Sequence, residues 1–166
     1  MVRMKYLLIA ALMVIFGIVM AITAFPSEEK RVKKQFRLLS EWVSKSTEEN
    51  AFTMLERMKQ IGSLFDAHCE LRVPDQSLSG SYTREEISTY AGSARSQVSQ
   101  IDLKFYDLQV AFPEKEVAKV TLTARLTGRS TAGERIDETR ELECLLRKIE
   151  KKWLFSQIEV IEVLKK

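Results

Sequence analysis

The chain has 166 residues, of which 45% are hydrophobic and 30% are charged, and its formal net charge is +3. This length suits one compact domain with a short appendage, and the composition is that of a globular chain, which excludes a disordered or fibrous protein. The small net charge and the dispersed basic residues argue against nucleic acid as a partner.

The N-terminal segment carries a membrane signal. Arg3 and Lys5 precede an uncharged run of 20 residues, from Tyr6 to Phe25, which is long enough to cross a hydrocarbon core of about 30 Å as a helix. We therefore predict a membrane anchor over residues 1–27, with a transmembrane helix at about 6–25. A cleaved signal peptide is the alternative, because the stretch AITA, which ends at Ala24, offers the small residues that a cleavage site needs.

Charged residues on both sides of the apolar run bear on its orientation. Arg3 and Lys5 favour a cytoplasmic amino terminus, whereas a basic cluster over residues 30–37 competes with them. We expect a single-pass protein of the bacterial inner membrane with its soluble domain in the periplasm. If the domain lay in the cytoplasm instead, the same basic cluster would contact anionic lipid.

Two amphipathic helices are predicted next. The first covers residues 28–46 as a juxtamembrane helix, because its apolar residues recur at helical spacing. For the second, Ser46 and Glu49 have the spacing of a capping box, so we expect this helix to begin there. The positions expected to face inward are Val32, Phe36, Leu39 and Val43 in the first helix, and Phe52, Leu55, Met58 and Ile61 in the second.

A short strand and a third helix follow. Residues 69–73 are predicted to form the strand, and the stretch after Pro74 is rich in turn formers and predicts a loop. Thr83 and Glu86 have the spacing of another capping box, which opens the third helix. Its expected inward positions are Ile87, Tyr90, Ala91, Ala94 and Val98.

After Gln100 the apolar residues alternate with a period of two, which predicts strands. The segments 101–112, 117–128 and 135–149 are separated by turn formers, and a last strand lies within 151–166. We expect a four-stranded antiparallel meander whose last strand is central, because both of its faces are mostly apolar. This order of elements predicts an α+β fold, with helices packed on one face of a curved antiparallel sheet.

Three stretches, LFDAHCELRVP, SGSYTREEISTYAGSAR and LRKIEKKWLFSQIEVIEV, resemble the nuclear transport factor 2-like superfamily, which includes SnoaL-like proteins and ketosteroid isomerases. The resemblance covers about residues 47–164. It implies a cone-shaped domain over residues 47–166, in which a bent sheet wraps around helices and encloses a pocket. In ketosteroid isomerases the catalytic Asp precedes a Pro at the end of the first strand. Here Val73 precedes Pro74, so the resemblance does not imply that chemistry.

Few residues suggest chemistry, and we predict no catalytic residue, metal or cofactor. His68 is the only histidine and lies near Asp66 and Glu70, which is a weak metal signal, so we interpret it as an exposed loop residue. Cys69 and Cys144 are interpreted as two buried thiols. A disulfide between them would need an oxidising compartment and Cα atoms within about 7 Å.

Polar residues interrupt apolar strand faces at two places. In a regular strand, Asp107 would share a face with Leu103 and Phe105, while Gln157 and Glu159 would share one with Trp153 and Phe155. If such carboxylates were buried, their pKa values would be raised and they could act as acids or bases. Alternatively, they lie in water. The candidate pocket residues are Tyr90, Phe105, Asp107, Trp153, Phe155, Gln157 and Glu159.

Two functions therefore remain open. The first is a membrane-tethered, non-catalytic binding or scaffold module, similar in layout to inner-membrane assembly factors of bacterial secretion systems. Its partner could be a second copy or another protein at the sheet, or a small apolar ligand. The alternative is a SnoaL-like enzyme that acts on a small apolar molecule by acid–base chemistry, with Asp107 or Glu159 as proton carrier.

Overall fold

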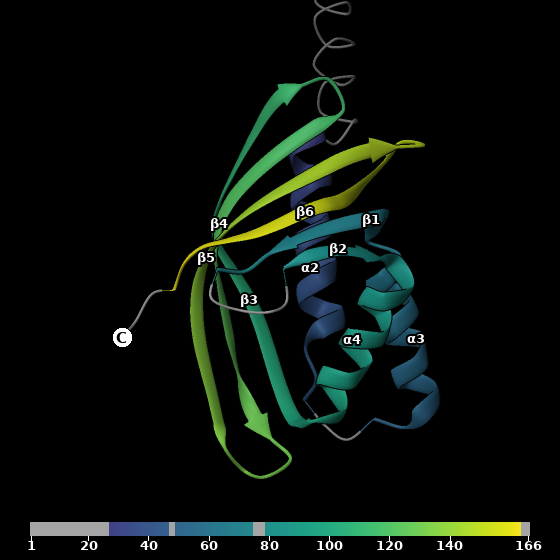
Figure 1. The fold of residues 1–166 in the computed structure, drawn as a ribbon, viewed down its shortest axis with the longest axis vertical. Helices are drawn as coiled ribbons and strands as arrows, with labels where there is room; N and C mark the ends of the chain where they lie inside the picture. The colour runs from purple at the N-terminus through teal and green to yellow at the C-terminus, as the bar shows by residue number, and fades with distance from the viewer. Residues whose placement is uncertain (1–26, 47–48, 75–78, 164–166) are drawn as a thin grey trace, which may run out of the picture. The chain divides into compact units, whose positions relative to one another are not determined.

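The computed structural model describes residues 27–46, 49–74 and 79–163 (Figure 1). The predicted transmembrane helix at 6–25 lies outside these residues. Within the described part, no helix is both long and apolar enough to cross a membrane. The fold belongs to the second of the two compact units into which the chain divides, Met1–Arg31 and Val32–Lys166.

Three helices are described: α2 (Glu28–Val43), α3 (Ala51–Gly62) and α4 (Arg84–Ser96). The capping box of α4 is present as predicted, since the Thr83 hydroxyl accepts from the Glu86 backbone N–H and the Glu86 carboxylate accepts from that of Thr83. Of the positions expected to face inward, Ile87 is buried, but Tyr90 is 54% exposed and Ala94 is exposed as well. Val98 is buried in the strand that follows.

The predicted start of α3 is wrong. Its N-cap is Asn50, whose side chain accepts a hydrogen bond of 2.8 Å from the Thr53 backbone N–H. The chain before it is held extended, because Lys45 exchanges two backbone hydrogen bonds, of 2.7 and 2.9 Å, with Ile101. The inward positions predicted for this helix are also partly wrong, since Phe52 and Leu55 are 77% and 50% exposed.

Six strands form one curved, unclosed sheet in the order β2-β1-β6-β5-β4-β3. The meander is confirmed, and β6 is central, as predicted. β6 pairs antiparallel with β5 and parallel with β1, while the other neighbours are antiparallel. The strands are β1 (Phe65–Arg72), β2 (Gly80–Thr83), β3 (Val98–Glu114), β4 (Val117–Ser130), β5 (Arg135–Ile149) and β6 (Lys152–Val163). β1 begins four residues before the predicted strand, and β2 begins at the end of the predicted loop.

The core lies between α2 and the face of the sheet that it covers, which we call the inner face. Phe36 of α2 contacts Phe105 and Phe155 edge to face, with ring centroids 5.5 and 5.0 Å apart, and Phe65 lies 5.4 Å from Phe155. Burying each such ring stabilises the fold by roughly 1.5–3 kcal/mol. The helix after the predicted anchor thus supplies a central part of the core.

The free edge of β3 is partly covered by the end of α2 and the residues after it. Besides the Lys45–Ile101 bridge, the Ser40 hydroxyl donates to the Leu103 carbonyl at 2.5 Å, and the Ser44 hydroxyl accepts from the Leu103 N–H at 3.0 Å. These contacts satisfy backbone groups of β3 that face away from β4.

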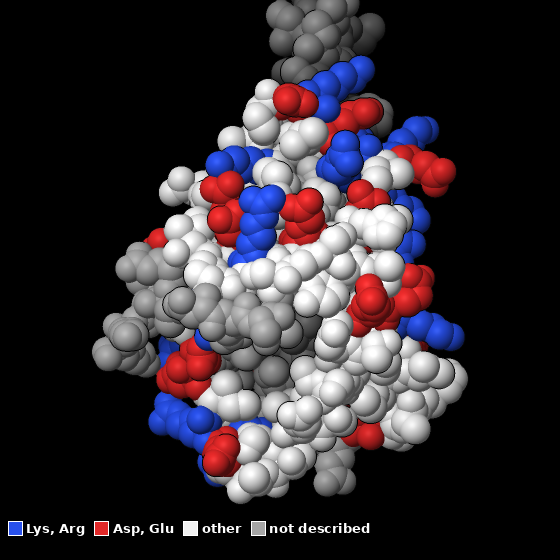
Figure 2. All heavy atoms as spheres, viewed as in Figure 1, with Lys and Arg blue, Asp and Glu red and all other residues white. Residues whose placement is uncertain are grey.

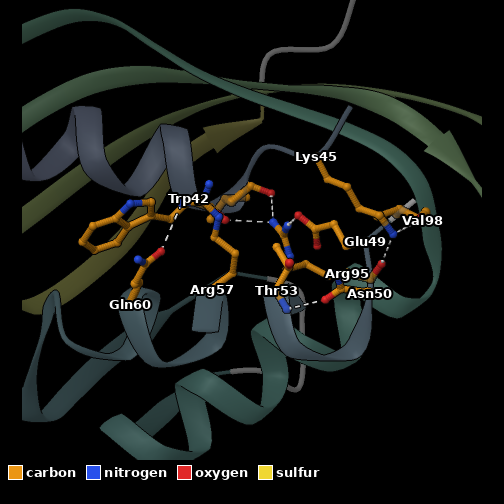
Figure 3. A network of polar contacts seen from close by, with 10 residues as sticks. Trp42, Lys45, Glu49, Asn50, Thr53, Arg57, Gln60, Arg95 and Val98 are labelled. Atoms are coloured by element: carbon orange, nitrogen blue, oxygen red, sulfur yellow. Dashed lines mark hydrogen bonds and ion pairs between the residues drawn. The ribbon is translucent and has the colours of Figure 1, made fainter. Parts of the chain in front are cut away.

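A buried arginine joins the three helices (Figure 3). Arg95 of α4 is only 3% exposed, and its guanidinium donates to the carbonyls of Trp42 (2.8 Å) and Val43 at the end of α2. It also pairs with Glu49 at 2.5 Å, just before α3 begins. A cation suits this place because the last carbonyls of a helix lack intrahelical partners and carry partial negative charge.

Candidate functional site

A β-bulge in β6 decides where Gln157 and Glu159 lie. Phe155 pairs with Leu146 of β5, and Gln157 pairs with Leu145, so Ser156 is an extra residue between two consecutive pairs. An extra residue exchanges the two faces for the residues after it, here as far as Val160, since Ile161 is a second extra residue. Ile158 and Val160 therefore continue the inner face that Trp153 and Phe155 begin. The expectation that Gln157 and Glu159 share that face is wrong.

Residues paired directly across neighbouring strands share a face of the sheet, and these rows confirm the exchange. Inner rows are buried or half-buried and apolar: Ala118, Leu146, Phe155 and Phe65, then Val120, Cys144, Ile158 and Leu71. Outer rows are mostly polar: Lys119, Leu145, Gln157 and Glu70, then Thr121, Glu143, Glu159 and Arg72.

A second bulge displaces Asp107 in the same way. Tyr106 pairs with Thr123 but Gln109 pairs with Thr121, so β3 contains one extra residue between them. Asp107 has a φ of 55°, in the left-handed region that Asp tolerates better than most residues. Its side chain is exposed, and Leu108 and Val110 pack against the core after it. Asp107 thus leaves the face that Phe105 occupies.

The seven candidate residues do not form one site. Phe105 and Phe155 both contact Phe36, and Trp153 is buried with its ring centroid 5.8 Å from that of Phe112. Tyr90 is exposed on α4 and packs edge to face on Tyr82. On the outer face, Gln157 donates to Glu159 at 3.2 Å.

Glu70, Glu159 and Glu143 on the outer face are paired with cations. Arg72 lies 2.8 Å from Glu70 and 3.8 Å from Glu159, and Lys119 lies 2.8 Å from Glu143. Asp107 lines a separate hollow of about 290 Å³ on this face, together with Gln109, Thr121, Leu122, Thr123, Glu141, Leu142 and Ile161.

An apolar groove of about 360 Å³ lies between α2 and β3. Phe36 and Ser40 come from the helix, and Phe105, Tyr106 and Leu108 from the strand. Its ionisable side chains besides Tyr106 are all cations: Lys33, Arg37 and Lys104. This volume lies at the small end of the range typical of ligand pockets. We call this feature the α2–β3 groove.

The groove was missed from the sequence, except for Phe105. A signal was present, because Lys33, Arg37 and Ser40 follow one flank of α2 at helical spacing beside Phe36. The partners on β3 depend on the bulge at Asp107, which turns Leu108 toward the core. Periodicity alone would place Leu108 on the opposite face.

Metal and thiol chemistry find little support. His68 is exposed in β1, and no group of metal-binding side chains occurs in the part of the chain that the structure describes. Cys69 and Cys144 are buried free thiols. They belong to β1 and β5, which flank β6, so two strand spacings of about 4.8 Å separate them, too far for a disulfide.

Burial also makes the thiols unreactive. It raises the pKa of Cys69 to about 12, with smaller contributions from Asp66 and Glu70. The pKa of Cys144 is raised even further, again mainly by burial. Because the thiolate is the nucleophile, neither cysteine is suited to covalent catalysis near neutral pH.

Charge is mixed over the surface that Figure 2 shows. Basic and acidic side chains alternate there, and uncharged residues gather over α3 and α4, where Phe52 and Leu55 are exposed. This face has no extended basic area of the kind that nucleic acid would need.

No protein-family model matches the chain, and no curated protein does. Solved structures match over most of its length. Aln2 from a Streptomyces species is 15% identical with a TM-score of 0.61, covering 82% of this chain and 90% of its own. A hexachlorocyclohexane dehydrochlorinase of the LinA type from Novosphingobium barchaimii is 10% identical with a TM-score of 0.64, covering 83% and 89%.

A third match has no known function. It is a Nostoc punctiforme protein with a cystatin-like fold, 12% identical with a TM-score of 0.60, covering 83% of this chain and 92% of its own. The fold is nuclear transport factor 2-like, or SnoaL-like. The matched share is larger than residues 47–164 could supply, so the likeness extends beyond the stretch that the sequence indicates. At these identities it concerns the fold alone.

Proposed function

We propose that this chain is a membrane-tethered, non-catalytic module that binds a small apolar molecule in the α2–β3 groove. The observation that carries the proposal is the composition of this groove: an apolar floor bordered by cations, with no carboxylate or histidine among its lining residues. A proton carrier near neutral pH is most often such a group. The carboxylates that could have served, Asp107 and Glu159, lie elsewhere.

Ligand binding in the α2–β3 groove is tested by a substitution that fills the groove with a larger side chain. In Leu108→Trp the larger ring occupies the groove, and Leu55→Trp makes the same change at an exposed position of α3. The full chain, reconstituted in nanodiscs of neutral phosphatidylcholine, is screened against small aromatic compounds by ligand-observed NMR, with empty nanodiscs as blank. We expect compounds that bind the wild type and Leu55→Trp but not Leu108→Trp. Binding that survives in Leu108→Trp would contradict the proposal.

The enzymatic alternative stays open because a dehydrochlorinase of a small apolar compound has the same fold. Mass spectrometry of compounds recovered after incubation separates the two functions. A bound compound recovered unchanged supports a binding module. Conversion that is lost in Asp107→Asn or Glu159→Gln would favour the enzyme instead.

The tether rests on the apolar run at 6–25 and its flanking charges, and we propose that the domain lies in the periplasm of a bacterium. A reporter that is active only outside the cytoplasm, fused after Lys166, is expected to be active; an inactive reporter would place the domain in the cytoplasm. A partner protein or a second copy at the outer face of the sheet also stays a prediction.

A further inference from the structure

We propose that the α2–β3 groove is selective for a small carboxylate with an aromatic or alicyclic body. This inference rests on the proposed function, because it names the class of molecule that the same groove binds. Its basis is the combination of aromatic and aliphatic lining residues with three cations, Lys33, Arg37 and Lys104.

The floor sets the apolar body. Phe105 is half-buried and lines the groove, and Phe36, which is only 2% exposed, lies edge to face behind it at 5.5 Å; Leu108 and Tyr106 also line the groove along β3. Aromatic rings prefer such offset or edge-to-face partners. A volume of about 360 Å³ admits a molecule of one or two rings rather than a long lipid chain.

The walls set the charge of the ligand. Lys33 and Arg37 lie one turn apart on α2; Lys104 of β3 also lines the groove, although it pairs with Arg125 and so belongs to an outer row of the sheet. Lys104 shares its charge with Asp102, 2.8 Å away, so it contributes less than a lone cation would. Arg37 is exposed and forms no ion pair within the described part of the chain. Its planar guanidinium can bind both oxygens of a carboxylate.

A second hollow, on the outer face of the sheet, has the opposite character. It is lined by Asp107 and Glu141 with uncharged residues, so an anion would be repelled there. In a third hollow, between β1 and β2, Arg72 is paired with Glu70 at 2.8 Å. An anionic aromatic compound is therefore expected to prefer the groove between α2 and β3. Neutral and cationic analogues of the same size lack that preference.

The test compares three probes with one ring system: 2-naphthoate, 2-naphthamide and 2-naphthylmethylammonium. Their affinities are measured by equilibrium dialysis against the full chain in phosphatidylcholine nanodiscs, with empty nanodiscs as blank. We expect 2-naphthoate to bind about tenfold more tightly than 2-naphthamide, since a hydrogen-bonded charge contributes about 1.5–3 kcal/mol and 1.4 kcal/mol corresponds to tenfold. The ammonium compound should bind more weakly than both.

The charge is tested on α2 itself. Arg37→Gln should lower the affinity for 2-naphthoate about tenfold while leaving that for 2-naphthamide within about twofold. Lys34→Gln removes an equal charge three residues away, outside the groove lining, and should change neither affinity by more than about twofold. Unfolding curves of both variants verify that the fold is retained.

Two different results would overturn the two proposals. Equal affinities for the three probes, unaffected by Arg37→Gln but abolished by Leu108→Trp, would refute selectivity for a carboxylate and leave the binding module standing. Absence of binding by all three probes, or binding that Leu108→Trp does not weaken, would refute both.

Discussion

The inner and outer faces of the sheet are stabilised by different interactions, although strands β4, β5, β6 and β1 contribute residues to both. On the inner face, rings and aliphatic side chains pack against α2, and Phe155 and Leu146 are fully buried. On the outer face, Arg72, Glu159 and their neighbours form ion pairs that remain partly exposed. Burial of apolar surface outweighs exposed ion pairs, which contribute about 0–1 kcal/mol each. The inner face should therefore carry most of the stability.

Inserting one alanine between Ile158 and Glu159 should break this difference and have the largest effect. The inserted residue would take the outer place of Glu159, and Glu159 would take the inward place of Val160 opposite Leu142. Burying a carboxylate in an apolar core should cost more than about 4 kcal/mol, so cooperative unfolding in urea is expected to be lost. The fluorescence of Trp42 and Trp153 in the full chain, recorded against urea concentration, measures this unfolding transition.

The control for that insertion is Ser156→Ala, which keeps the bulge and both faces and removes only the hydroxyl that donates to the Leu145 carbonyl at 3.2 Å. It should cost about 1 kcal/mol. An insertion variant that unfolds like Ser156→Ala would contradict the assignment of the faces of β6.

Adjacent leucines of β5 compare the two faces with one substitution. Leu146→Ala opens a cavity beside Phe155 and should lower the free energy of unfolding by about 2–5 kcal/mol. Leu145→Ala, on the outer face, should cost less than about 1 kcal/mol because its side chain is only half-buried. Urea unfolding measures both, and equal losses would contradict the assignment of the faces.

Two arginines extend the comparison from apolar to charged residues. Arg95→Ala leaves Glu49 and the last carbonyls of α2 without their buried cation, so about 3 kcal/mol should be lost. Arg72→Ala removes an exposed cation from the outer face and should cost less than about 1 kcal/mol. Thermal unfolding of both variants provides the test; a larger loss for Arg72→Ala would refute it.

The smallest effect concerns the capping box of α4. Hydrogen bonds from the Thr83 backbone and hydroxyl lower the pKa of Glu86 in the folded state. The ionised carboxylate therefore stabilises the fold above its unfolded pKa, and this contribution disappears as pH falls through the lower, folded value. Glu86→Gln should reduce the loss of stability on acidification from pH 6 to pH 3; an unchanged pH profile would contradict this role.

Sequence periodicity predicts the elements of this fold better than their faces. β4 and β5 pair without interruption from Val117 to Arg129, so their alternation indicates the buried side correctly. In β6 the apolar positions change from odd to even residue numbers between Phe155 and Ile158. Such a change indicates a β-bulge, because one extra residue shifts the alternation by one position. The contact between Phe36 of α2 and Phe105 of β3 could not be predicted from the sequence, because it depends on how the sheet curves around α2.

The covered edge of β3 bears on how this protein behaves at high concentration. Sheet edges with free N–H and C=O groups invite pairing between molecules, which leads to aggregation. Here Lys45, Ser40 and Ser44 occupy those groups at Ile101 and Leu103. The residues that end α2 thereby help to keep neighbouring copies apart where the proposed tether would crowd them.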